Sequence, residues 1–127
     1  MAIVSSMILA ILAQGAAPAT EFSQETYDVG FEELVANDNS EAREVIENSD
    51  TLAQDDPARL INRGIALARM GNYESARADF ELAANARDSV ELETADGNWV
   101  DSRRLARKAL AMLEKGDFAR YYALSLR

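Results

Sequence analysis

The chain has 127 residues, of which 48% are hydrophobic and 28% charged, a composition typical of one soluble globular domain. It contains no cysteine, which excludes disulfide bonds, thiol catalysis and zinc–thiolate sites. It contains no histidine either, which removes the commonest general base and metal ligand. The net charge of −9 argues against nucleic acid or an anionic membrane surface as a partner.

The first 19 residues carry no charged side chain. Their apolar run, from Ala2 to Ala13, is shorter than the roughly 20 residues that span a bilayer as a helix. Ala17 and Ala19 satisfy the small-x-small rule for cleavage after Ala19, so residues 1–19 are predicted to be a secretory signal peptide. Export, in a bacterium to the periplasm, is the expected localisation. The α-amino group is the only positive charge there, so an uncleaved N-terminal anchor or a start codon assigned too early stay open as alternatives.

Residues 20–56 are strongly acidic, and Arg43 is their only basic residue. A helical period still runs through them, and it predicts one helix over about 24–36 and a second that begins near Ser40 as N-cap. Asn37 lies between the two helices and can adopt the left-handed backbone conformation that ends a helix. The acidic side chains are interpreted as a solvated helix face rather than as a ligand site.

Residues 57–87 give the clearest pattern in the chain. Apolar and small residues recur at steps of three and four on both sides of a break, where Gly71 can take a positive φ. Asp56 can cap the first helix, whose first residue is a proline. The pattern predicts a helical hairpin, with Gly64 and Ala76 small where the two helices come close.

The same segment resembles a tetratricopeptide repeat, a helix-turn-helix unit of about 34 residues. With Pro57 as the first position, the characteristic slots of the family fall on Leu60, Gly64, Leu67, Gly71, Tyr73, Ala76, Phe80 and Ala83. Arg63 departs from the family pattern, because its slot usually holds an aliphatic residue. Residues 23–56 form a weaker copy in the same phase, in which Gly30 takes the slot of Gly64.

Residues 88–101 break the helical period. Leu92 lies between two acids and Asp96-Gly97 is a turn signal, so a short β-hairpin or ordered loop is predicted near 88–101. Trp99, the only tryptophan, is predicted to pin this insert onto the helices. The calcium-binding EF-hand pattern is absent, and neither a metal nor another cofactor is expected.

The helical period returns after Asp101, which is a candidate N-cap together with Ser102. Gly116 repeats the break of Gly71 after 45 residues, which is one repeat plus an insert of eleven. The last stretch, 118–126, is predicted to be a short helix that covers the end of the stack. The resemblance thus implies an all-α, right-handed α-solenoid of about three hairpins in a domain over 20–127, with units at 23–56, 57–90 and 102–127.

In the tetratricopeptide family, the first helices of successive units line a concave groove that binds peptides or partner proteins. The resemblance therefore implies a small exported bacterial protein-interaction module, without a small-molecule substrate. Carried over slot by slot, the expected lining is Tyr27, Phe31, Ile61, Asn62, Ile65, Arg69, Arg103, Ala106, Arg107 and Leu110. One subgroup grips the C-terminal carboxylate of a partner, and three of the slots of that clamp hold Asn62, Arg103 and Arg107 here. The first-unit slots of the clamp hold aromatic residues instead, so the clamp is incomplete. Arg103 and Arg107 can equally be exposed helix charges.

The same residues bear on two other function classes. The first unit is acidic and the stretch after residue 101 is basic, so opposite ends could attract and give a self-assembling component of the cell envelope, a homo-oligomer. Enzymatic activity is not expected, because the chain has no phosphate-binding loop and no G-x-S-x-G motif, and its acids form no identifiable catalytic pair.

Overall fold

The computed structural model describes residues 29–120. This part is mostly helical, with one small antiparallel sheet. Its elements are α2 (Phe31–Val35), α3 (Asn39–Glu47), α4 (Pro57–Arg69), α5 (Tyr73–Ala84), β1 (Glu91–Glu93), β2 (Trp99–Asp101) and α6 (Ser102–Glu114). The predicted signal peptide, the groove residue Tyr27 and most of the predicted terminal helix lie outside the described residues. Within residues 29–120, every helix is too short or too polar to cross a bilayer.

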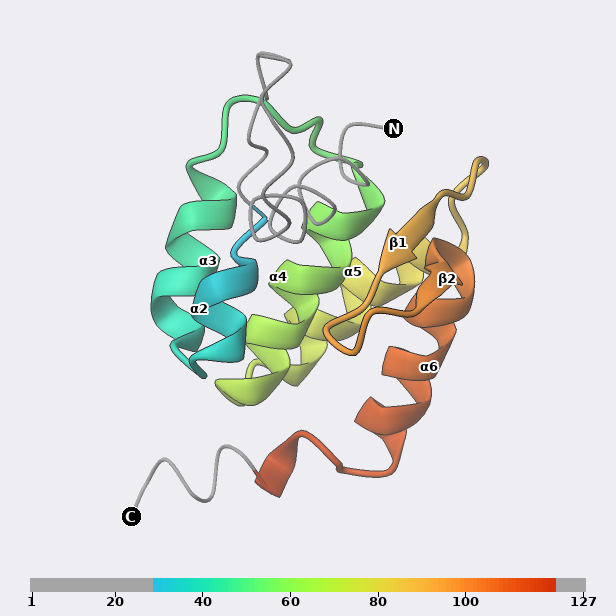
Figure 1. Ribbon diagram of the computed structural model, residues 1–127. Helices are drawn as coiled ribbons and strands as arrows, with labels where there is room; N and C mark the ends of the chain where they lie inside the picture. The colour runs from blue at the N-terminus through green and yellow to red at the C-terminus, as the bar shows by residue number, and fades with distance from the viewer. Residues whose placement is uncertain (1–28, 121–127) are drawn as a thin grey trace.

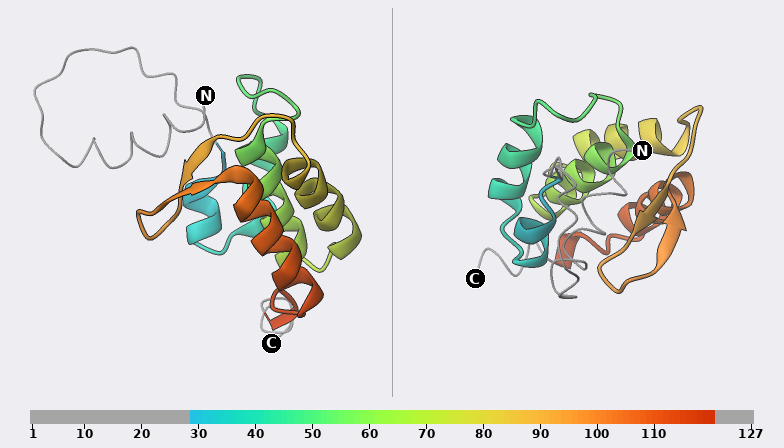
Figure 2. Two further views of the ribbon diagram at one scale, coloured as in Figure 1. Left: turned by 90° about the vertical axis from the view of Figure 1, so that its right-hand side faces the viewer. Right: turned by 45° about the horizontal axis from the view of Figure 1, so that its top comes forward.

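The helices pack in chain order around α4. Both α3 and α5 pack against α4, and α6 packs against α5. In Figure 1, α2 and α3 lie on one side of α4, while α6 and the hairpin of β1 and β2 lie on the other. The tilted view in Figure 2 shows the same arrangement. Because α2 and α6 also touch α4 directly, the first helices of the three predicted units are neighbours.

The predicted breaks at Asn37, Gly71 and Gly116 are confirmed, since all three residues have a left-handed backbone, with φ of 60°, 85° and 74°. They follow α2, α4 and α6, and each of these helices ends with the same pair of hydrogen bonds. After α4, for example, the N–H of Gly71 donates to Ala68 O and that of Asn72 to Leu67 O. This is the Schellman arrangement, which satisfies the last free carbonyl groups of a helix. The chain therefore repeats one helix-ending device at three places.

The prediction of one continuous helix over 24–36 is wrong at Gly30. This glycine has φ 67° and is the N-cap of α2, so the helix begins at Phe31. A Cβ atom on Gly30 would lie 3.0 Å from both Ala42 O and Cδ1 of Ile46 on α3, so only glycine fits there comfortably. Gly30 thus turns the chain, whereas Gly64, in the equivalent slot, lies inside a helix.

The ends of the other helices depend on carboxylate caps. The N-cap of the second helix of the first unit lies two residues earlier than predicted, because Asp38, and not Ser40, accepts a hydrogen bond from the N–H of Glu41. The predicted cap of α4 is confirmed: Asp56 accepts from the N–H groups of Ala58 and Arg59. Burial raises the pKa of Asp56 above its usual value, although these hydrogen bonds oppose the rise.

The α4–α5 hairpin provides the core of the protein. Five of the predicted apolar slots are buried, namely Leu60, Leu67, Ala76, Phe80 and Ala83. Gly64 faces α5 as predicted, and a Cβ atom added to it would lie 2.4 Å from Cε1 of Phe80. Phe80 in turn stacks on Phe118, with ring centroids 6.1 Å apart. The close approach of α4 and α5 thus depends on a glycine facing a phenylalanine.

The predicted β-hairpin is confirmed, with Glu91, Leu92 and Glu93 paired to Asp101, Val100 and Trp99. The predicted role of Trp99 is wrong, because 43% of its surface is exposed. Leu92, on the other strand, is buried in the main hydrophobic cluster and anchors the hairpin. The apolar residue that faces the helices, and not the largest one, therefore holds the insert.

Candidate functional site

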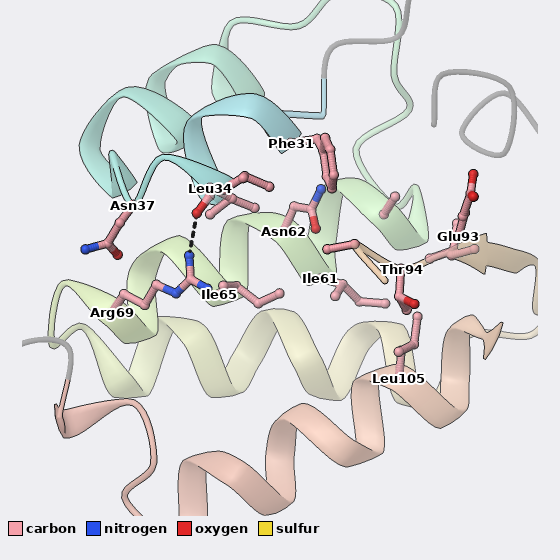
Figure 3. Close-up of a pocket in the computed structure, with 14 residues that line it drawn as sticks. Phe31, Leu34, Asn37, Ile61, Asn62, Ile65, Arg69, Glu93, Thr94 and Leu105 are labelled. Atoms are coloured by element: carbon pink, nitrogen blue, oxygen red, sulfur yellow. Dashed lines mark hydrogen bonds between the residues drawn. The ribbon is translucent and has the colours of Figure 1, made fainter. Parts of the chain in front are cut away.

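An open groove of about 570 Å³ runs along α2 and α4 and is closed on one side by the β-hairpin (Figure 3). Its lining comes from α2, α4, β1 and α6, and from the turns after α2 and β1. Neither α3 nor α5 contributes a residue to this lining. The lining residues are Phe31, Leu34, Val35, Asn37, Ala58, Ile61, Asn62, Ile65, Arg69, Leu92, Glu93, Thr94, Ala95 and Leu105.

The floor of the groove is apolar. Ile61 and Ile65 project from consecutive turns of α4, between Phe31 of α2 and Leu105 of α6 (Figure 3). Phe31, Ile65 and Leu105 are only partly buried and pack against the core, so each keeps some surface free for a ligand. Such a floor favours apolar side chains, because their burial removes hydrocarbon surface from water.

Two polar side chains of α4 hold the short helix α2 in place. The Nδ2 of Asn62 donates to Val29 O at 2.8 Å. Nη1 of Arg69 donates to Leu34 O at 2.9 Å, the bond that Figure 3 draws as a dashed line. A helix of five residues is far too short to be stable alone. Asn62 and Arg69 therefore help to keep the wall of the groove preformed.

The predicted groove residues divide into two groups. Phe31, Ile61, Asn62, Ile65 and Arg69 all line the groove, whereas Arg103, Ala106, Arg107 and Leu110 are absent from its described lining. Arg103 instead donates to Oγ of Ser89, and Arg107 is exposed to solvent. A carboxylate clamp of Asn62, Arg103 and Arg107 is therefore not assembled around this groove.

The contribution of the hairpin to the groove is not predicted from the sequence. Residues 92–95 line the end of the groove that the resemblance assigns to the third unit. The alternation that predicts a strand at Leu92 is the available signal, but it does not show which face the hairpin covers. Val35 is not among the predicted residues either, although it lies one turn after Phe31 on the same helix face and is 64% exposed.

Glu93 is the one acidic residue in the described lining, and it is unusual in its surroundings. Only 6% of its surface is exposed, and its Oε2 atom is buried with no hydrogen-bond partner. Buried carboxylates are normally paired with donors or cations, since removing an unpaired charge from water is costly. Glu93 therefore places a buried carboxylate oxygen without a hydrogen-bond donor among the lining residues of the groove.

The tip and base of the hairpin are held by two carboxylates outside the groove. Hydrogen bonds from the Thr94 hydroxyl and the Asn98 N–H lower the pKa of Asp96. Hydrogen bonds from the Ser89 hydroxyl and the Arg104 N–H lower the pKa of Asp101. Of the two candidate N-caps of α6, Asp101 and Ser102, the structure has Asp101. Both carboxylates are thus ionised at neutral pH and stabilise the hairpin that walls the groove.

On the other face of α4, an ion pair with Asp79 accounts for the departure of Arg63 from the repeat pattern. Its Nε and Nη2 donate to the two carboxylate oxygens of Asp79 on α5, each at 2.8 Å. The carboxylate is 7% exposed, and these bonds raise the pKa of Arg63 in spite of desolvation. A bidentate ion pair therefore joins α4 to α5 where the family pattern has an aliphatic contact.

We expect Asp79→Asn to lower the free energy of unfolding by about 2 kcal/mol, because it leaves the half-buried Arg63 without its partner charge. The double variant Arg63→Met/Asp79→Leu should lie within about 1 kcal/mol of the wild type, because an apolar contact replaces the ion pair. Urea unfolding followed by circular dichroism measures both. Equal or larger loss in the double variant would show that the pair is not the stabilising feature.

No group of three or more acidic side chains that could hold a metal ion occurs within the described residues. The site is thus an apolar groove with one arginine and one glutamate, and its described lining contains no arrangement of groups typical of a catalytic centre.

The chain matches no protein-family model, no curated protein and no solved structure.

Proposed function

We propose that the protein is a tetratricopeptide-like, non-catalytic interaction module that binds an apolar peptide segment of a partner protein in the groove along α2 and α4. In this proposal the helical hairpins form a short right-handed solenoid. The proposal is carried by one observation: the helical lining of the groove comes from α2, α4 and α6, the first helices of the three units. This is the surface that the resemblance implies for ligand binding.

The repeated helix endings support the same proposal. The left-handed residues after α2, α4 and α6 are separated by 34 and 45 residues, as expected for units with one insert. Equivalent helix endings give successive hairpins similar geometry, and similar hairpins stack to leave one continuous face. Export to the periplasm belongs to this proposal as well, and it depends on the uncharged segment 1–19, outside the described residues.

The chemistry of the groove favours a peptide over a polar metabolite. The side chains of Asn62 and Arg69 already donate to backbone carbonyl groups of the first unit, so part of their hydrogen-bonding capacity holds α2 in place. Affinity must then come mainly from apolar contact, with each buried aliphatic side chain contributing about 1.5–3 kcal/mol. Several such side chains in one short segment give a specific interaction.

We predict that Val35→Asn weakens peptide binding about tenfold, because it removes an exposed apolar contact from the groove wall. The probe is a peptide selected from a displayed library of random nonapeptides, and its dissociation constant is measured by fluorescence anisotropy. Leu82→Asn is the matched control, since Leu82 is 61% exposed on α5 and lies outside the groove. Both side chains are exposed, so neither change should unfold the protein.

Equal affinities of the wild type and both variants for every selected peptide would contradict binding in this groove. A selection that yields no binder would have the same meaning. Peptide binding that is weakened by Leu82→Asn and not by Val35→Asn would place the binding site on α5 instead.

A further inference from the structure

The charge of the groove is divided between its two ends. Arg69 and Glu93 are the two ionisable residues in its described lining, and Figure 3 shows them at opposite ends of the apolar floor. The Arg69 guanidinium donates to Leu34 O and lies 3.5 Å from Oδ1 of Asn39. The two ends of the groove are therefore chemically distinct.

Glu93 differs from Arg69, whose guanidinium already donates to a backbone carbonyl group of α2. Its Oε2 has no partner among the described residues, although the side chain is nine-tenths buried. A carboxylate in such a place is attracted strongly to any cation that reaches it, since little water remains to screen the charges. An ammonium or guanidinium group would supply the missing donors as charge-assisted hydrogen bonds.

We propose that the groove selects a peptide segment that carries a lysine or arginine beside its apolar residues, and that Glu93 pairs with this cation. The inference rests on the proposed function and adds the charge and the direction of the ligand. The apolar side chains occupy the floor along Ile61 and Ile65, and the cationic residue lies at the hairpin end.

A comparison with Glu91 shows why the pairing with the peptide cation is assigned to Glu93. It lies on the same strand two residues earlier, but it is exposed and is not part of the groove lining. An exposed carboxylate gives a surface ion pair, which contributes little in water. Glu91→Gln therefore provides a control with the same change in net charge.

The test uses random nonapeptides displayed on phage and selected separately on the wild-type protein, Glu93→Gln and Glu91→Gln. We expect lysine or arginine to be enriched at one position by the wild type and by Glu91→Gln, and this enrichment to disappear with Glu93→Gln. For the best wild-type peptide, Glu93→Gln should weaken binding about 10- to 100-fold, the loss of one charge-assisted hydrogen bond.

A peptide in which norleucine replaces the selected cation separates pairing from misfolding. It should bind the wild type and Glu93→Gln with the same affinity, because neither complex contains the ion pair. Groove-binding peptides without a preferred cation, or a preference that survives Glu93→Gln, would overturn the role of Glu93 and leave the proposed function intact. Peptides whose binding is insensitive to Val35→Asn would overturn the proposed function, and this inference with it.

Discussion

Replacing Arg59 with alanine is expected to lower the free energy of unfolding by about 3–5 kcal/mol, a larger loss than for Asp79→Asn. Arg59 is 2% exposed, and its guanidinium lies under the end of α3. It donates to Glu47 O at 3.3 Å, Ser49 O at 3.0 Å and Leu52 O at 3.3 Å. One side chain thus satisfies three carbonyl groups in the link between the first and second units.

Alanine in this place leaves those carbonyl groups without a donor and opens a cavity beside them. Each buried unsatisfied acceptor costs about 1–3 kcal/mol, and the positive charge that favours the C-terminus of α3 is lost as well. Because domains of this size are stable by about 5–15 kcal/mol, the variant should be marginal at 37 °C. Urea unfolding followed by circular dichroism measures the change.

Arg43→Ala is the matched control for Arg59→Ala. Arg43 lies on α3 itself and pairs with Glu47 at 3.6 Å, but both side chains are more than 40% exposed. Its loss should change the free energy of unfolding by no more than about 0.5 kcal/mol. Similar stabilities of the two variants would contradict a structural role of the Arg59 guanidinium.

Gly64→Ala is expected to lower the free energy of unfolding by about 2 kcal/mol, although alanine is the better helix former. The new Cβ would lie 2.4 Å from Cε1 and 2.8 Å from Cδ1 of Phe80. An ordinary carbon–carbon contact is about 3.5 Å, so α4 and α5 would have to separate by about 1 Å. Phe80 cannot yield easily, because it is fully buried and stacked on Phe118.

The double variant Gly64→Ala/Phe80→Leu identifies the cause of this loss. A smaller side chain at position 80 makes room for the new methyl group, so the double variant should lose at least about 1 kcal/mol less than the sum of the two single variants. Thermal unfolding of the four proteins gives this coupling energy. Strictly additive losses would mean that Gly64 does not set the approach of α4 to α5.

The features that the sequence predicted correctly are those with local causes. Asn37, Gly71 and Gly116 end helices because their backbones tolerate a positive φ, and Asp56 caps a helix whose first residue is a proline. The hairpin near 88–101 likewise follows from its alternation and its turn signal. Such signals act within a few residues, so periodicity and turn chemistry are enough to find them.

The features that the sequence did not predict depend on contacts between distant segments. The helical pattern predicts no partner for Arg59 or Arg63, but one lies beneath α3 and the other pairs with Asp79. Gly30 matches Gly64 by spacing, whereas its contact with α3 bends the chain and starts the helix late. Pattern reasoning cannot distinguish these outcomes, because the deciding partners are far away in the sequence.

Among the predicted groove residues that the structure describes, those of the first two units line the groove and those of the third do not. Phe31, Ile61 and Ile65 line the groove because they keep the helical spacing that the resemblance used. Arg103 and Arg107 do not, since the β-hairpin occupies that end and α6 contributes only Leu105 to the described lining. An insert of eleven residues thus changed which side chains reach the groove.

The central claim is that a peptide binds along the apolar floor formed by α4. The most direct measurement is a methyl NMR spectrum of the isoleucine-labelled protein, titrated with a nonapeptide selected on it. We predict that the δ1-methyl signals of Ile61 and Ile65 shift with the peptide, while that of Ile46, which is fully buried outside the groove, does not. A peptide that binds and leaves the Ile61 and Ile65 signals unchanged would contradict the claim.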